Sequence, residues 1–206
     1  TSGAYFWGAQ LEASTLTDYQ PITDLNTEVL ALFPNTTMFQ DRAGTTAVTT
    51  PGQFVGVRLD KSKGLALGSE LVTNGDFATS TYWTLSSSTI SAGRLDVNAA
   101  SSLVTATGTS VAAAVGTPVL ITFDVTSYTS GSIRAEYRGL SSSYVGAIGS
   151  FRAVGVVSAG GAIQFRANAG TVLSIDNVSV KELPGNHAFA PTDAARMTYG
   201  IEPKTG

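Results

Sequence analysis

Polar side chains alternate with apolar ones along two stretches in the second half of this 206-residue chain. Such alternation predicts half-buried β-strands, each with one face in a core and the other in solvent. The predicted outward positions are Arg134, Glu136 and Arg138 on the first strand and Gln164, Arg166 and Asn168 on the second. Guanidinium, carboxylate and amide groups are planar hydrogen-bonding partners for hydroxyl groups. Two such strands side by side would therefore form a trough suited to a sugar.

Aromatic side chains near this trough would complete a sugar site, because the C–H faces of sugars stack on aromatic rings. Tyr82, Tyr128 and Tyr144 lie in or beside predicted loops and could form its rim. The predicted carbohydrate-binding residues are therefore Tyr82, Tyr128, Arg134, Glu136, Arg138, Tyr144, Gln164 and Arg166. The alternative is that the strand residues form only the ordinary solvated face of a sheet. We expect Trp83 in the core rather than at a ligand, since large aromatic residues bury well.

Catalytic chemistry has little support in the sequence. The chain has no cysteine and a single histidine, His187, which excludes a thiol nucleophile and a multi-histidine metal site within one chain. It contains no Walker phosphate loop, GxSxG elbow or HExxH motif. A glycosidase needs two carboxylates across a cleft, and no pattern places Glu136 and Asp124 opposite each other. We therefore expect a non-enzymatic protein, with a polysaccharide-degrading enzyme as the least supported alternative.

The composition favours β-structure. Hydrophobic residues make up 43% and charged residues only 13%, which suits sheets rich in Thr and Val better than helices with charged surfaces. The net charge of −3 does not provide the excess of positive charge that binding to nucleic acid or an anionic membrane would need. No apolar run reaches the length of a membrane span. The chain begins with Thr and no signal peptide, so we expect a processed or partial product.

Regularly spaced strand patterns between residues 66 and 184 predict an all-β sandwich domain. The expected core positions are Leu95, Val97 and Ala99, then Val119, Ile121, Phe123 and Val125, then Ile133, Ala135 and Tyr137, and finally Ile163, Phe165 and Ala167. The last strand changes parity between Ile175 and Val178. We expect a single-residue β-bulge near residues 176–177 to restore its core face.

We expect the segments on either side of the sandwich to be connectors rather than further domains. Residues 1–23 contain an alternating strand over residues 5–11, which closes a preceding module or pairs with a neighbouring subunit. Residues 24–65 form a connector with a short helix over residues 24–32, two turns and a short strand over residues 54–59. Residues 185–206 form a connector toward a following domain.

Two phrases bracket the predicted sandwich: ELVTNGDF at residues 70–77 and SIDNVSVKEL at residues 174–183. Together they resemble the opening and closing strands of jelly-roll carbohydrate-binding modules of families four and nine. The resemblance implies a jelly roll over residues 66–184 and a structural calcium ion between its first and last strands. The implied ligands are Asn74, Asp76 and Asp176, although the family often has an acidic residue where this chain has Ala78. Alternatively, Asp176 only accepts hydrogen bonds from turn amides.

The flanking segments resemble parts of bacteriophage tail and virion proteins. The phrase WGAQLE at residues 7–12 is similar to the last strand of another jelly-roll module in those proteins. There, the phrase LDKS, found here at residues 59–62, often runs directly into GNHA, found here at residues 185–188. The resemblance implies a binding module inserted into a connector, since a sandwich has its termini close together.

These resemblances imply a module of a virion, in a tail fibre or similar appendage, that attaches to host cell-surface glycans. Its partners would be that glycan and other virion subunits, in a homo-oligomer that is trimeric by analogy with phage fibres. We expect no nucleic-acid partner and no membrane insertion. The alternative is a purely structural or decorating module of the virion without sugar binding.

Overall fold

The computed structural model describes residues 38–42, 44–60, 66–190 and 192–200. The segment at residues 1–23, with its predicted strand, and the predicted helix at residues 24–32 lie outside these residues. The described chain is built from β-strands and one short 3₁₀ helix, η1 (Asp193–Ala195). No helix among the described residues has the length and apolar character needed to cross a membrane.

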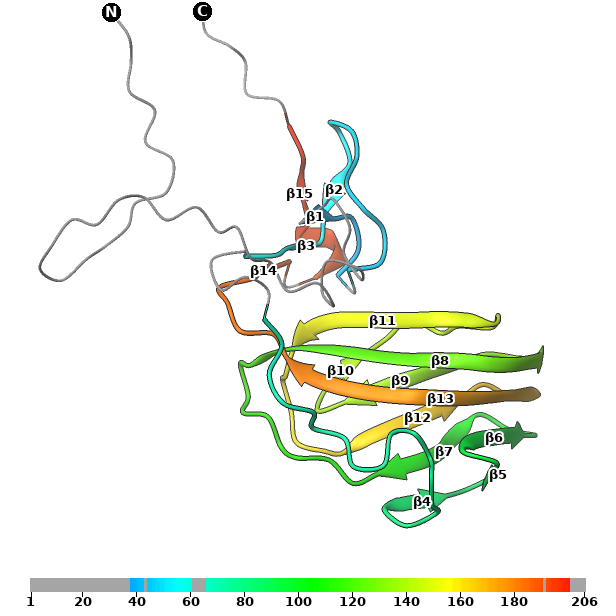
Figure 1. Ribbon diagram of the computed structural model, residues 1–206. Coiled ribbons are helices and arrows are strands. Elements are labelled where there is room, and N and C mark those ends of the chain that lie inside the picture. The colour runs from blue at the N-terminus through cyan, green and yellow to red at the C-terminus, as the bar shows by residue number, and fades with distance from the viewer. Residues whose placement is uncertain (1–37, 43, 61–65, 191, 201–206) are drawn as a thin grey trace, which may run out of the picture.

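Two five-stranded antiparallel sheets pack face to face (Figure 1). The first, called here the β9–β12 sheet, has the order β10 (Leu140–Ser141), β9 (Ile133–Tyr137), β12 (Ile163–Ala167), β7 (Leu103–Gly108) and β4 (Trp83–Leu85). The second, the β8–β13 sheet, has the order β11 (Gly149–Val156), β8 (Pro118–Ser130), β13 (Thr171–Glu182), β6 (Arg94–Ala99) and β5 (Ser88–Ser91). From β6 onward the chain repeatedly crosses between the sheets, as in a jelly roll. The all-β sandwich prediction is confirmed.

The predicted core faces are confirmed. All thirteen expected core residues of β6, β8, β9 and β12 are at most 2% exposed. Phe123 from one sheet meets Phe165 from the other edge to face, with ring centroids 5.4 Å apart. Trp83 is only 7% exposed and packs on Phe77 at 4.8 Å, so it lies in the core as expected. Period-two burial of apolar residues on both sheets thus builds the sandwich.

The bulge predicted in the closing strand is present. Asp176 pairs with Asp124, while Ser179 pairs with Thr122, so β13 has one more residue than β8 over this stretch. The extra residue lets Ile175 and Val178 both face the core. Asn177 adopts a positive φ of 53° at the bulge, a conformation that Asn tolerates better than most residues.

The opening and closing phrases lie side by side. Glu70 bridges to Lys181, and the amide of Leu71 donates to the carbonyl of Val180 at 2.9 Å. Farther along, the amide of Val178 donates to the carbonyl of Gly75 at 2.8 Å. The two ends of the sandwich therefore close against each other, which the resemblance to jelly-roll modules implied.

The segments on either side of the sandwich meet in a small flanking unit (Figure 1). Its strands are β1 (Met38–Phe39), β2 (Phe54–Val55), β3 (Val57–Arg58), β14 (Ala188–Phe189) and β15 (Met197–Thr198). They form the sheets β1–β3–β14 and β15–β2. The single strand predicted over residues 54–59 is therefore wrong. It is split at Gly56, where a Cβ atom would stand 2.5 Å from the backbone of Asp41.

The flanking unit packs on the sandwich through a second, smaller apolar cluster. Phe39, Val57 and Leu59 of the unit join Leu120, Val154 and Leu183 of the sandwich in this cluster. Leu120 alternates with the core residues of β8 and so points to the outer face, yet it is only 3% exposed because this cluster covers it. Asp60 and His187 add polar links, since the amide of Asp60 donates to His187 Nδ1 at 2.9 Å.

Candidate functional site

The structure places the two predicted polar strands next to each other. β9 pairs with β12 in an antiparallel register that sets Arg134 opposite Arg166 and Glu136 opposite Gln164. Their neighbours in sequence, such as Ala135 and Phe165, are buried, so these four side chains share the outer face of the β9–β12 sheet. Together with Tyr144 they are called the ion-paired face below.

A shared carboxylate organises the ion-paired face. Glu136 Oε1 accepts a hydrogen bond from Arg134 Nε at 2.8 Å and one from Arg166 Nε at 3.3 Å. The three side chains are 20–37% exposed, so solvent and a ligand can reach them. Two guanidinium groups against one carboxylate leave one positive charge in excess on this face. The remaining N–H groups of both arginines are directed donors for a ligand oxygen.

Tyr144 supplies the aromatic component of this face. The guanidinium carbon of Arg134 lies 4.9 Å from the centroid of the Tyr144 ring, in cation–π contact. Two backbone hydrogen bonds between Val145 and Ile133, at 2.8 and 2.9 Å, hold the Tyr144 loop against the start of β9. With 37% of its surface exposed, Tyr144 still presents part of its ring to solvent.

Three of the predicted sugar-binding residues do not join this face. Arg138 has a positive φ of 47° after the end of β9, and its guanidinium donates to the carbonyl of Gly161 at 3.3 Å. Tyr82 directly precedes β4, three strands away from β9 at the opposite edge of the sheet. Tyr128 belongs to β8 in the other sheet, where its hydroxyl donates to the carbonyl of Gly131 at 3.3 Å.

The predicted calcium ligands are engaged in local hydrogen bonds. Asn74 Nδ2 donates to the carbonyls of Thr79 and Thr81, so this side chain holds the loop that follows the opening strand. Asp76 accepts from the amide of Ala78 at 3.3 Å, and Asp176 accepts from the amide of Asn177 at 2.6 Å. Within the described ranges, no three His, Asp or Glu side chains gather in a group suited to a metal ion. These residues do not form a ready ligand set, and the calcium ion stays a prediction.

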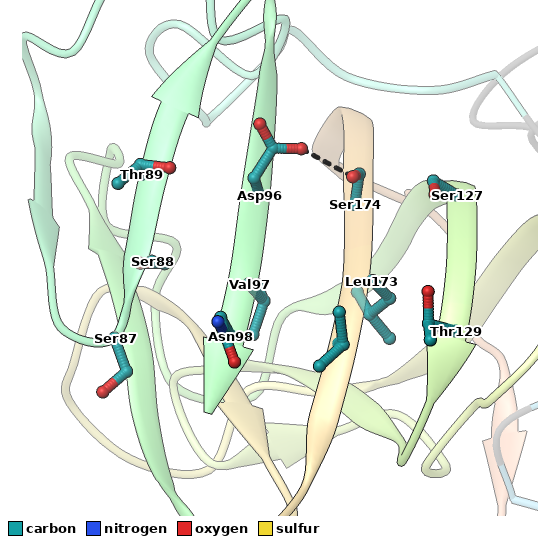
Figure 2. Close-up of a pocket in the computed structure, with 11 residues that line it drawn as sticks. Ser87, Ser88, Thr89, Asp96, Val97, Asn98, Ser127, Thr129, Leu173 and Ser174 are labelled. Atoms are coloured by element: carbon teal, nitrogen blue, oxygen red, sulfur yellow. Dashed lines mark hydrogen bonds between the residues drawn. The ribbon is translucent and has the colours of Figure 1, made fainter. Parts of the chain in front are cut away.

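The opposite face of the molecule carries a groove that the sequence did not predict. It lies on the outer face of the β8–β13 sheet, has a volume of about 530 Å³ and crosses strands β5, β6, β13 and β8 (Figure 2). Its lining consists of Ser87, Ser88, Thr89, Asp96, Val97, Asn98, Ser127, Thr129, Val172, Leu173 and Ser174. The alternation of polar and apolar residues in β6 and β13 was the available signal, but small hydroxyl side chains also occur on any solvated sheet.

Among the described residues that line this groove, Asp96 is the only charged one. It accepts hydrogen bonds from Ser174 Oγ at 2.6 Å, Ser91 Oγ at 2.5 Å and Arg94 Nε at 2.8 Å. Partial burial alone would raise the pKa of Asp96, but these hydrogen bonds and the charge of Arg94 lower it below its ordinary value of 3.8. The carboxylate is therefore ionised at neutral pH and fixed in orientation.

No protein-family model and no curated protein matches this chain. By its fold, the protein is an all-β sandwich with a small flanking β unit.

Proposed function

We propose that this protein is a non-enzymatic module of a bacteriophage virion, in a tail fibre or similar appendage, that binds glycans on the host surface. The observation that carries the proposal is the ion-paired face, where Arg134, Glu136 and Arg166 converge beside the exposed ring of Tyr144. Planar charged groups bind pairs of hydroxyl or carboxylate oxygens, and an aromatic ring contacts the C–H face of a sugar.

The charge of this face favours an acidic glycan. Arg134 and Arg166 share Glu136, which leaves a net charge of +1 to attract a sugar carboxylate. Guanidinium groups bind carboxylates in bidentate geometry, so uronic or sialic acids fit better than neutral sugars. The existing ion pairs also hold the arginine side chains in place, which reduces the entropy that a ligand must offset on binding.

The flanking unit supports the virion part of the proposal. The phrase that contains Asp60 and the phrase that contains Asn186 and His187 are separated by the whole sandwich in sequence. They meet through the bonds from Asn186 N to Asp60 Oδ2 and from Asp60 N to His187 Nδ1, both 2.9 Å long. This contact is the one expected if the sandwich interrupts a connector of the kind found in phage tail proteins.

A structural role in the virion is the second candidate. The apolar cluster around Leu120, Val154 and Leu183 fixes the sandwich to the flanking unit, as a decorating module requires. Under this alternative the ion-paired face would bind no glycan.

Glycan-array binding with the purified chain tests the proposal. We expect binding to acidic bacterial glycans, weakened about tenfold to a hundredfold by Arg134→Ala or Arg166→Ala, because each variant removes charge-assisted hydrogen bonds. Arg42→Ala is the matched control, since it removes an exposed arginine of the flanking unit. Equal binding by the unaltered chain and all three variants would rule out the ion-paired face as the glycan site. Binding to no glycan would leave the structural role as the better account.

A further inference from the structure

Asn74 holds together the loop that follows the opening strand. Its side-chain amide donates to the carbonyls of Thr79 and Thr81 at 2.7 and 3.2 Å, and its Oδ1 accepts from Thr79 N at 3.3 Å. Its main-chain carbonyl accepts from the indole N–H of Trp83 at 2.9 Å. With a φ of 58°, the residue adopts the left-handed conformation that asparagine tolerates better than most residues. Both its backbone and its side chain therefore favour asparagine at this position.

The next residue, Gly75, is fixed by the closing strand. A Cβ atom at this position would stand 1.9 Å from the carbonyl oxygen of Val178, so a larger residue would require a shift of the backbone. The amide of Val178 also donates to the carbonyl of Gly75 at 2.8 Å. The fold thus places asparagine directly before glycine at the point where the opening and closing strands meet.

An asparagine that precedes a glycine is chemically labile. The main-chain nitrogen of the glycine, after losing its proton, attacks the side-chain Cγ of the asparagine, and the side-chain nitrogen leaves as ammonia. Water then opens the resulting succinimide ring at either carbonyl, which gives aspartate or isoaspartate. Glycine permits this attack best because it has no Cβ to hinder it, and asparagine is among the thermolabile residues. The reaction needs no reagent other than water.

The closed sandwich hinders this reaction at Asn74. The attack requires Cγ of Asn74 to rotate onto Gly75 N, but the hydrogen bonds to residues 79 and 81 hold the side-chain amide toward the loop. The bond from Val178 restrains the following peptide as well. Local opening of the two strands would release both restraints. Glu70 opposes that opening, because its Oε1 accepts from Val180 N of the closing strand at 2.9 Å.

We infer that Asn74–Gly75 is a site of spontaneous deamidation, which the pairing of the opening and closing strands protects and whose modification then prevents normal closure. Aspartate at this position lacks the two N–H donors and would turn a carboxylate toward the carbonyls of Thr79 and Thr81. Isoaspartate lengthens the main chain by one carbon and would displace Gly75 from Val178. Each deamidation is irreversible, so the site limits the lifetime of the closed sandwich. This inference does not depend on the ion-paired face.

Peptide mapping by mass spectrometry measures the rate at Asn74 in the full chain at mildly alkaline pH. In the folded protein this rate should be at least about tenfold lower than in the chain unfolded by urea. Glu70→Ala should raise the rate in the folded protein at least about tenfold, because it removes the acceptor of Val180 N. Glu182→Gln, near the end of the same closing strand, is the control and should leave the rate unchanged.

The unaltered chain at urea concentrations below its unfolding midpoint provides the same test if the Glu70 variant does not fold. Equal rates at Asn74 in the folded and unfolded chain would overturn the inference. So would a rate that neither Glu70→Ala nor such urea concentrations increase.

The stability of the reacted protein tests the effect of the modification. Ion-exchange chromatography separates the deamidated fraction, which carries an added negative charge, and peptide mapping verifies that Asn74 has reacted. This fraction should unfold at a lower urea concentration than the unreacted fraction of the same preparation, and the variant Asn74→Asp should do the same. An unchanged midpoint in the deamidated fraction would contradict the claim that modification prevents closure.

Discussion

Glu70 offers the sharpest test of how the sandwich is closed. Its carboxylate accepts hydrogen bonds from the amides of Leu71, Val72 and Val180, at 3.0, 2.9 and 2.9 Å. It also accepts one from the hydroxyl of Ser179. One side chain thus joins the opening strand to the closing strand. The substitution Glu70→Ala would remove all four interactions while leaving the apolar core intact.

The cost of this substitution follows from the amides that it leaves without a hydrogen-bond acceptor. Leu71 N keeps the carbonyl of Val180 as a partner, whereas the amides of Val72 and Val180 lose the acceptor provided by Glu70. Each unsatisfied donor costs about 1–3 kcal/mol, and partial solvent access favours the lower half of that range. We therefore expect Glu70→Ala to lower the free energy of unfolding by about 2–4 kcal/mol. At about 2–4 °C per kcal/mol, the melting temperature should fall by about 10 °C.

Urea unfolding followed by tryptophan fluorescence measures this change, with the m-value as a check on two-state behaviour. Glu70→Gln keeps one side-chain oxygen as acceptor and should cost about 1 kcal/mol. Glu182→Gln removes a carboxylate near the end of the same closing strand and serves as the control. A loss below about 0.5 kcal/mol for Glu70→Ala would refute the view that this carboxylate holds the two strands together.

Two further changes probe the same framework. Gly75→Ala should destabilise the protein by about 1–3 kcal/mol in the same urea assay, because its Cβ would stand 1.9 Å from the carbonyl oxygen of Val178; an unchanged midpoint would contradict this close approach. Burial disfavours the charged imidazolium and so lowers the pKa of His187 below its ordinary value of 6.5. The neutral ring leaves Nδ1 able to accept from Asp60 N. The contribution of His187 to stability should therefore be complete above pH 6.5 and decline as the pH falls below it; His187→Gln should remove this part of the pH dependence of the melting temperature.

Patterns within single strands were sufficient to predict much of the sandwich. The alternation around Ala135 and Phe165 identified the buried faces of β9 and β12, and therefore the outward positions of Arg134 and Arg166. The change of parity after Ile175 identified the bulge, because a strand cannot bury both parities without an extra residue. These features depend only on local geometry and on the two-residue alternation of side chains along a strand.

Features that depend on contacts between distant segments were not predictable. The strand breaks at Gly56, where the backbone of Asp41 approaches closely. Leu120 is buried by a flanking unit assembled from both ends of the sandwich. The groove on the β8–β13 sheet depends on the register between neighbouring strands, and the alternation within one strand does not determine that register. For the same reason Tyr82 and Tyr128, although exposed as expected, could not be assigned to a sheet.

The most direct test of glycan recognition is a crystal structure of this chain with a fragment of an acidic host-surface polysaccharide. The account predicts the fragment on the outer face of the β9–β12 sheet, with its carboxylate at Arg134 and Arg166 and one sugar ring against Tyr144. A fragment bound only elsewhere on the protein, or no bound fragment at concentrations well above those used on the array, would contradict the account.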